Sequence, residues 1–227
     1  MKNTYISTVY DLKRTPKTDY PVKFVEYLIK RFNLKPHSNL LEIGCGRCDF
    51  LLAFSENNFN CIGVDKEIIS LENNNVKLYK VDIKKDKLPF ADETFDVVYH
   101  KSVIEHFYSP DNLMQESLRV LKKGGKLIVL TPDWISQMQN FYEDYTHSRP
   151  YTVGALKDLF VIYNLKNAQV ELFYQLPIVW KIPQIKIICK ILSVFLNSFT
   201  ARKITEITKI KFFRWAVELM IIGYGEK

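Results

Sequence analysis

Glycine and cysteine are both scarce in this chain, and its first residues contain no long apolar run. Eight glycines and four cysteines occur among 227 residues. The cysteines show no disulfide framework, which is typical of a reducing compartment. The opening residues, MKNTYISTVYDLKR, lack the hydrophobic segment of a secretory signal. No internal repeat or low-complexity tract is present. We therefore expect a cytoplasmic protein with one domain and a sizeable core.

Most of the chain also lacks net charge. The formal charge is +7, and residues 181–214 contain eight basic residues against one acid, Glu206. Outside that segment 24 basic and 24 acidic residues remain, from totals of 32 and 25. A segment that carries the whole excess indicates an anionic partner, either a membrane surface or a nucleic acid.

The stretch from Asn39 to Leu52, NLLEIGCGRCDFLL, predicts a ligand-binding turn. A short apolar run ends in Gly44-Cys45-Gly46, and helical spacing begins at Arg47. A buried strand that turns through glycines into a helix N-terminus can let a ligand approach its backbone, because glycine has no Cβ. The alternative is a plain strand–helix connection without a ligand.

The turn lacks the third glycine of a dinucleotide-binding GxGxxG sequence. That position, three residues after Gly46, is Asp49, whose carboxylate would repel a pyrophosphate. This argues against NAD. Cys45-x-x-Cys48 matches the spacing of a redox or zinc pair, but neither a second pair nor a histidine partner accompanies it. We expect no metal site.

The stretch LLEIGCGRCDF resembles the ExGxGxG signature of class I S-adenosylmethionine-dependent methyltransferases. Glu42, Gly44 and Gly46 match it, and Cys48 replaces the third glycine. The segment LRVLKKGGKLIVL, residues 118–130, is close to the structural "RVLKPGG" segment of the same family. The resemblance implies S-adenosyl-L-methionine as cofactor. Its expected binding residues are Glu42, Gly44, Cys45, Gly46, Asp65, Lys66, Asp82, Ile83, His100 and Lys101.

Two acids at strand ends fit this resemblance. Asp65 follows the second predicted strand, nineteen residues after Gly46, where an acid can accept both ribose hydroxyls of an adenosine. Asp82 ends the third strand and resembles the acid that binds the adenine amino group, with the Ile83 backbone beside it. The alternatives are a helix-capping role for Asp65 and a turn-forming role for Asp82.

Short apolar strands alternate with helices, which predicts a Rossmann-like doubly wound α/β fold. We expect seven strands, with the last one antiparallel as in the family that the chain resembles. The predicted strands are 40–43, 60–64, 76–81, 95–99, 126–130, 169–174 and 217–224. The predicted helices are 20–32, 47–54, 67–73, 112–121 and 152–163.

The domain organisation follows from these elements. Residues 1–18 are predicted to form an irregular arm, and residues 19–175 with 215–227 the core of a single domain. About forty residues separate the last two strands, and an insertion of that length indicates function or added structure. We expect residues 176–214 to form a basic amphipathic helical insertion.

Histidines supply the candidate catalytic residues. Glu105-His106 follows the fourth strand, and a histidine's pKa near neutrality suits general-base catalysis at a hydroxyl. His147 and Arg149 lie in YTHSRPYT, which resembles a segment of methyltransferases from surface-polysaccharide clusters. The predicted catalytic residues are His106 and His147. The alternative is that both histidines only stabilise the conformation of their loops. No Asn-Pro-Pro-Tyr or Asp-Pro-Pro-Tyr sequence follows the fourth strand, which weakens a DNA-methylating role.

The sequence thus predicts a methyltransferase that acts on a small or lipid-linked acceptor, at an oxygen of a glycan intermediate. A quinone or isoprenoid lipid is the alternative acceptor. A non-catalytic cofactor-binding module and an RNA-binding protein are rivals from other classes, although we do not expect nucleic acid as the partner. The oligomeric state stays open.

The insertion predicts contact with an anionic membrane surface through residues 181–214. Lys186, Lys190, Ser193 and Asn197 share one face of a predicted helix. Apolar residues occupy the opposite face: Ile185, Ile188, Leu192, Phe195, Leu196 and Phe199. The expected location is therefore peripheral, at the inner membrane face. A lid over the sheet or a dimer contact is the alternative.

Overall fold

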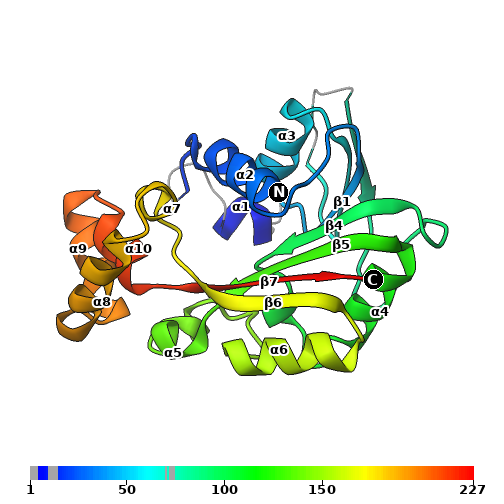
Figure 1. Cartoon of the computed structure of the whole chain (residues 1–227). Coiled ribbons are helices and arrows are strands. Elements are labelled where there is room, and N and C mark those ends of the chain that lie inside the picture. Colours follow the sequence, from blue (N-terminus) through cyan, green and yellow to red (C-terminus); the bar gives the residue numbers. More distant parts are fainter. Residues whose placement is uncertain (1–4, 10–14, 70, 72–74) are drawn as a thin grey trace. The chain divides into compact units, whose positions relative to one another are not determined.

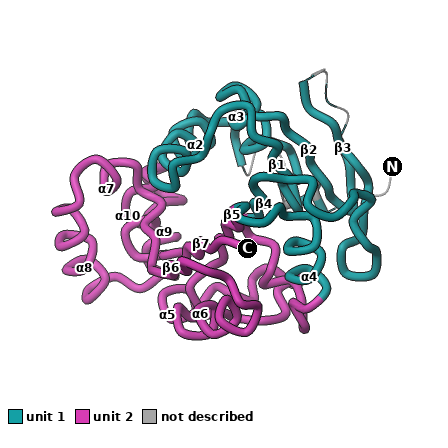
Figure 2. Tube along the Cα trace, turned by 45° about the vertical axis from the view of Figure 1, so that its right-hand side comes forward, with its two compact units in different colours: residues 1–100, 112–125 teal, residues 101–111, 126–227 magenta. Residues whose placement is uncertain are grey.

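The structure is a computed structural model that describes residues 5–9, 15–69, 71 and 75–227. The chain divides into two compact units (Figure 2). Unit 1 comprises residues 1–100 and 112–125, and unit 2 comprises residues 101–111 and 126–227. The strands form one seven-stranded sheet in the order β3-β2-β1-β4-β5-β7-β6.

Unit 1 contains the glycine turn and the parallel strands around it. β1 pairs in parallel with β2 and β4, and β2 pairs in parallel with β3. These parallel neighbours, with α2 before β1, α3 between β1 and β2 and α4 after β4, give the doubly wound arrangement expected from the sequence. The elements are α1 (Tyr5–Val9), α2 (Tyr20–Arg31), β1 (Asn39–Ile43), α3 (Asp49–Glu56), β2 (Asn60–Asp65), β3 (Val76–Lys80), β4 (Phe95–Lys101, whose last residue belongs to unit 2) and α4 (Asp111–Val120, whose first residue belongs to unit 2).

Unit 2 contains the antiparallel strands. β7 pairs antiparallel with both β5 and β6, as expected for the last strand (Figure 1). The elements are η1 (Ile104–His106), β5 (Leu121–Pro132, whose first five residues belong to unit 1), α5 (Trp134–Gln137), η2 (Phe141–Glu143), α6 (Val153–Ile162), β6 (Lys166–Phe173), α7 (Pro177–Lys181), α8 (Ile185–Phe195), α9 (Ser198–Thr208), α10 (Phe212–Val217) and β7 (Met220–Glu226).

The core of unit 1 holds the glycine turn in place. Phe24 of α2 packs edge-on against Phe50 of α3, with ring centroids 5.6 Å apart. Phe54 of α3 meets Tyr99 of β4 in the same manner at 5.5 Å. Phe24, Phe54 and Tyr99 are fully buried. The helix that follows the turn is therefore fixed to the sheet on one side and to α2 on the other.

The LRVLKKGG segment has the structural role expected of it. The Arg119 guanidinium donates hydrogen bonds to the backbone oxygens of Leu88 and Phe90, at 3.0 and 2.8 Å. It also pairs with Glu116, whose carboxylate accepts from the Leu88 amide at 2.7 Å. One side chain thus satisfies several backbone groups of the 88–92 loop.

Several local expectations differ from the structure. The last strand, expected over 217–224, begins at Met220, since residues 212–217 form α10. Residues 5–9 form a helix within the arm that was expected to be irregular. The helix expected over 67–73 is absent at 67–69 and 71, and its other residues lie outside the described ones. β5 begins at Leu121 rather than at Lys126, so residues 121–125 lie within the strand, where Gly124 adopts a φ of 71°. The insertion helix ends at Phe195, because Asn197 caps a new helix, α9.

Helices α7–α10 pack around a core of their own. Its buried members are Tyr174, Leu176, Val179, Cys189, Ala201, Ala216 and Val217. Buried Glu218 joins α9 and α10, because it pairs with Arg202 and, at 2.7 Å, with Arg214. The insertion is therefore helical, as expected. Among the described residues no helix is long and apolar enough to cross a membrane.

Candidate active site

The glycine turn has the backbone geometry that a ligand needs. Gly44 and Gly46 adopt φ values of 73° and 49°, in the left-handed region that favours glycine. The amides of Gly44 and Cys45 donate to the Val64 oxygen of β2, which fixes the turn to the neighbouring strand. A Cβ placed on Gly46 would meet no atom within 4 Å, so space above this residue is open.

Cys48 stands where the family signature has its third glycine. Its φ is 63°, so a non-glycine residue adopts the glycine conformation here. The side chain is fully buried. The neighbouring Cys48 thiol, together with burial, holds the pKa of the Cys45 thiol well above its usual range. Both thiols are free, and the raised pKa of Cys45 disfavours the thiolate that a redox pair needs.

The argument from Asp49 against a dinucleotide is weaker than the sequence suggested. The Asp49 carboxylate pairs with the Arg47 guanidinium at 2.6 Å, and both side chains are largely buried. Arg47 also donates to the Thr15 oxygen at 2.7 Å. Because the acid is balanced within the turn, it repels an incoming phosphate less than a lone carboxylate would.

Asp65 ends β2 and contacts the turn directly. One carboxylate oxygen accepts from the Gly46 amide at 2.9 Å, and the other accepts from the Glu67 amide at 3.1 Å. The side chain is only partly buried, and carboxylate oxygens have further lone pairs for ribose hydroxyls. The side chain of Lys66 is exposed, with its ammonium 5.3 Å from the ring of Tyr5, and its role in cofactor binding stays a prediction.

The third-strand acid forms a turn. The Asp82 carboxylate accepts from the Lys84 amide at 3.2 Å, and the Asp82 carbonyl accepts from the amides of Lys85 and Asp86. Asn112 fixes the same loop by donating to the Ile83 oxygen at 2.6 Å. The turn-forming role is thus observed, and adenine binding by Asp82 and Ile83 stays a prediction.

Residues of β1 and β4 complete the set expected from the sequence. Glu42 is buried, with 3% of its surface exposed. His100 is fully buried, and burial lowers its pKa to about 3, so the ring is neutral. Its side chain therefore belongs to the core, and cofactor binding through its backbone stays a prediction. Lys101 is partly exposed.

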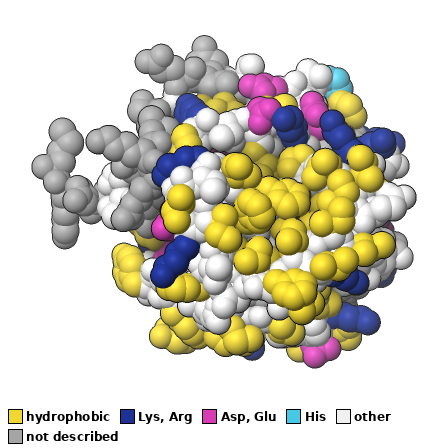
Figure 3. Space-filling view, turned by 90° about the vertical axis from the view of Figure 1, so that its left-hand side faces the viewer, with side chains coloured by type: hydrophobic (Ala, Val, Ile, Leu, Met, Phe, Trp, Pro, Cys, Tyr) yellow, Lys and Arg dark blue, Asp and Glu magenta, His cyan; other side chains and the backbone are white. Residues whose placement is uncertain are grey.

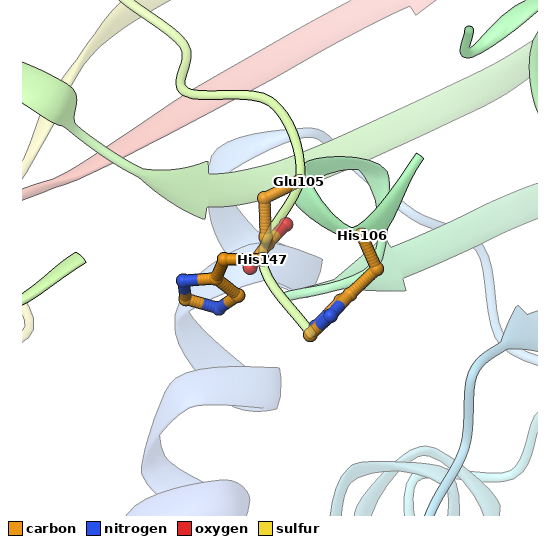
Figure 4. Close-up of side chains that lie close together, drawn as sticks. All are labelled: Glu105, His106 and His147. Carbon is orange, nitrogen blue, oxygen red and sulfur yellow. The ribbon is translucent and has the colours of Figure 1, made fainter. Parts of the chain in front are cut away.

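The two candidate catalytic histidines lie together in unit 2, forty-one positions apart in sequence. The rings of His106 and His147 meet edge-on with centroids 4.9 Å apart (Figure 4). The loop that carries His147 is tied to η1, because the amides of Ser148 and Arg149 both donate to the Glu105 carbonyl, at 2.8 and 3.0 Å. Sequence alone named both histidines, and the structure brings them into contact.

Oxygen acceptors set the tautomer of each ring. The Thr146 hydroxyl donates to Asp144 at 2.6 Å, so at its 2.8 Å contact with His106 Nδ1 it must accept. His147 Nδ1 lies 2.6 Å from the Phe141 carbonyl, which can only accept. In both rings Nδ1 therefore carries the proton, and in the neutral ring the lone pair lies on Nε2. Burial lowers the pKa of His147, which favours its neutral form.

Three neighbours of the histidines were missed by sequence reasoning as functional residues. Asp144 and Thr146 orient His106, and Thr131 donates to the fully buried Glu105 carboxylate at 3.0 Å. Thr146 lies inside YTHSRPYT, so the motif contained a signal for it. Nearby aromatic residues of the 131–152 region differ in exposure. Tyr142 and Tyr145 are exposed, whereas Trp134 packs edge-on against Phe141.

Comparison with known families decides the class of protein. A methyltransferase domain family model matches residues 17–170. The chain belongs to this family. The match includes the glycine turn, Asp65, Asp82 and both candidate histidines, and it confirms the recognition of an S-adenosylmethionine-dependent methyltransferase made from the sequence.

Individual relatives are similar to about half of the chain. The chain is 36% identical over 112 residues to an uncharacterized protein of Methanocaldococcus jannaschii, covering 48% of this chain and 52% of that protein. It is 32% identical over 113 residues to a demethylmenaquinone methyltransferase of Alkalihalophilus pseudofirmus, covering 45% and 48%. The chain thus spans about half the length of these curated relatives.

Similarity in structure extends over nearly the whole chain. A SAM-dependent methyltransferase from Archaeoglobus fulgidus superposes with a TM-score of 0.63 at 20% identity, covering 99% of this chain and 100% of that one. At this identity the likeness establishes the fold. For this methyltransferase the open space above Gly46 and the acid beside it, Asp65, fit the ribose and methionine portions of S-adenosylmethionine, which carries no phosphate to repel.

Proposed function

We propose that this methyltransferase transfers the methyl group of S-adenosylmethionine to a hydroxyl oxygen of a small or lipid-linked acceptor, with a glycan intermediate as the first candidate. The observation that carries the proposal is the contact between His106 of η1 and His147 of the YTHSRPYT segment. Their Nδ1 atoms face oxygen acceptors at 2.8 and 2.6 Å, so each neutral ring has a basic Nε2.

The reaction requires little chemistry from the protein's side chains. The acceptor oxygen attacks the methyl carbon, an oxygen–carbon bond forms, and the sulfur–carbon bond breaks with its electron pair passing to sulfur. The acceptor hydroxyl loses its proton to a base. The protein holds the donor and acceptor in line and excludes water, and a neutral histidine accepts the proton. The Glu42–Gly46 turn, Asp65 and Asp82 are the proposed donor site.

Exchange of the histidines tests this role. We expect at least one of His106→Ala and His147→Ala to lower the turnover number by about 10²–10⁴-fold, the usual contribution of a general base. Affinity for S-adenosylhomocysteine, measured by calorimetry, should be unchanged. His37→Asn, which removes an exposed imidazole, is the matched control. Normal turnover of both variants would show that neither histidine is the base and that the enzyme acts by positioning donor and acceptor.

The acceptor class is tested with labelled methyl donor and three pools of acceptor: lipid-linked saccharides, demethylated quinones and RNA. The proposal expects label in the saccharide pool. Label in the quinone pool would instead favour the second candidate, which rests on similarity to the demethylmenaquinone enzyme over 45% of this chain. Cofactor binding without transfer to any pool would favour a non-catalytic binding module.

Helix α8 carries the observation that favours a lipid-linked acceptor. At about 100° per residue its side chains divide into three arcs. Ile185, Cys189, Leu192 and Leu196 form the arc that packs against the core of α7–α10. A second arc is apolar and exposed: Ile187, Ile188, Ile191, Val194 and Phe195. The third arc is polar and holds Lys186 and Lys190.

The exposed apolar arc is part of a wider patch. Figure 3 shows hydrophobic side chains gathered on one face, with basic side chains at its edge. Isolated exposed apolar residues are common, but a contiguous patch indicates an interaction site. Arg202 and Arg214 are not available to an anionic surface, because both pair with buried Glu218. The other six basic residues of the insertion are exposed lysines that could contact such a surface: Lys181, Lys186, Lys190, Lys203, Lys209 and Lys211.

We therefore propose that α8 and its neighbours bind an anionic membrane surface, where each lysine adds about 1 kcal/mol. Co-sedimentation with vesicles of anionic and of neutral lipid tests this. Binding should require anionic lipid and weaken when Lys186, Lys190, Lys203 and Lys209 are changed to Glu, or when Ile187 and Ile191 are changed to Asp. Ile162→Asp, at an exposed apolar site on α6, is the control. Equal and negligible binding by all proteins would favour a lid or a dimer contact.

A further inference from the structure

Glu105, His106 and His147 form a cluster of potential metal ligands within unit 2. One donor atom from each residue lies within 4.8 Å of the other two (Figure 4). Three ligands at about 2.1 Å from one tetrahedral ion lie about 3.4 Å apart. Binding an ion therefore requires the donor atoms to approach one another by up to about 1.4 Å through side-chain rotation.

The carboxylate of Glu105 is the first reason to place a cation here. The residue is fully buried, and Oε2 accepts a hydrogen bond from the Thr131 hydroxyl at 3.0 Å. Among the described residues, Oε1 has no hydrogen-bond partner. A buried carboxylate oxygen without a partner is costly, and buried charges are ordinarily paired or coordinate a metal.

The two histidines have the outer partners of metal-binding imidazoles. A ligating histidine ordinarily donates its other ring N–H to a carbonyl, a carboxylate or a similar acceptor, which fixes the ring and its tautomer. His147 Nδ1 donates to the Phe141 carbonyl. His106 Nδ1 donates to the Thr146 hydroxyl, which itself donates to Asp144. Both rings thus present Nε2 as the ligand nitrogen.

We propose that Glu105, His106 and His147 bind one divalent transition-metal ion, with Zn²⁺ as the representative case. Two imidazoles and one carboxylate suit zinc and its first-row neighbours better than Mg²⁺ or Ca²⁺, which prefer all-oxygen sites. Three protein ligands leave a coordination position for an outside oxygen, as in catalytic zinc sites. A bound ion would occupy both Nε2 lone pairs, so it would take the place of the histidine base proposed above. An acceptor hydroxyl bound to the ion would have a lowered pKa.

This inference does not rest on the proposed reaction, because metal binding is measured without donor or acceptor. The full-length protein is stripped with a chelator and titrated with Zn²⁺ by calorimetry, and with Co²⁺ by visible absorption. We expect one ion per chain and a Co²⁺ spectrum without thiolate charge-transfer absorption. Such absorption would assign the ion to cysteines and overturn the proposal.

Variants locate the ion. Glu105→Gln and His147→Ala should each weaken Zn²⁺ binding at least tenfold. Thr146→Val, which removes only the orienting hydroxyl of His106, should weaken it about 10–100-fold. His37→Asn should bind as the wild type does. Circular dichroism checks that each variant is folded, and Thr146→Val keeps the test decisive if a ligand variant unfolds. Absence of Zn²⁺ binding by the wild type, or unchanged binding by the variants, would overturn the proposal.

Discussion

Individual residues of the glycine turn were predictable from the sequence, whereas their conformations were not. The spacing of Glu42, Gly44 and Gly46 identified the turn, and β1 and α3 flank it as expected. The sequence could not show that Cys48 adopts the left-handed φ of the glycine it replaces. Nor could it show that Arg47 balances Asp49, because an ion pair depends on side-chain positions rather than on spacing.

His100 provides a prediction at this scale. Burial lowers its pKa to about 3, below the ordinary value of 6.5. Between these values the unfolded chain binds more protons than the folded one, so the stability that His100 contributes falls as the pH falls from 6.5 towards 3. Between pH 7 and pH 5 the wild type should lose about 2 kcal/mol of unfolding free energy that His100→Gln retains. Denaturant titrations at the two pH values measure this.

The control for that measurement is His37→Asn, which removes an exposed imidazole and should lose the same free energy as the wild type. Parallel losses for wild type and His100→Gln would show that the ring titrates normally, and so that it is not buried as the structure has it.

At the scale of elements, the periodic helices and apolar strands were predictable and the boundaries were not. Helix α6 begins where the sequence predicted it, directly after Thr152, whose hydroxyl accepts from the Ala155 amide at 3.2 Å. Helix α8 was expected to continue to Phe199, but the chain bends at Leu196 and restarts after Asn197. Helical spacing alone cannot locate this break, because apolar residues continue on both sides of it. Helical spacing also cannot show which of the two apolar arcs of α8 packs against the core of α7–α10.

The cap of α9 can be tested by itself. The Asn197 side chain accepts a hydrogen bond from the Thr200 amide at 2.8 Å. Asn197→Ala should lower the stability of α9 by about 1 kcal/mol, the usual value for an N-cap, while Asn197→Asp should preserve it. Hydrogen exchange at the amides of α9 is the appropriate measurement, since a local helix can open without global unfolding. Equal exchange in both variants would mean that α8 continues through this position.

At the scale of the whole molecule, the sequence predicted the seven-stranded sheet with its antiparallel last strand and the methyltransferase family, and the structure and the family match confirm both. It named His106 and His147 separately but gave no reason to place them together. Their contact depends on a loop whose amides donate hydrogen bonds to the Glu105 carbonyl of η1. A hydrogen bond of this kind cannot be predicted from the spacing of apolar residues. The acceptor is the least predictable feature, because methyl transfer needs positioning more than a fixed set of residues.

The central claim is that the turn at Gly44–Gly46, with Asp65, binds S-adenosylmethionine. The most direct test is calorimetric titration of the wild type, Asp65→Ala and Asp65→Asn with S-adenosylhomocysteine. Because Asp65 also accepts from the Gly46 and Glu67 amides, Asp65→Asn is included to keep one acceptor oxygen in the turn. Asp158→Ala, at an exposed acid of α6, is the control.

We predict one site per chain in the wild type and in Asp158→Ala. Asp65→Ala should bind more weakly by about 1–3 kcal/mol, the range for a lost charge-assisted hydrogen bond, and Asp65→Asn by less. Folded wild-type protein that does not bind the ligand, or folded Asp65→Ala with wild-type affinity, would contradict the account.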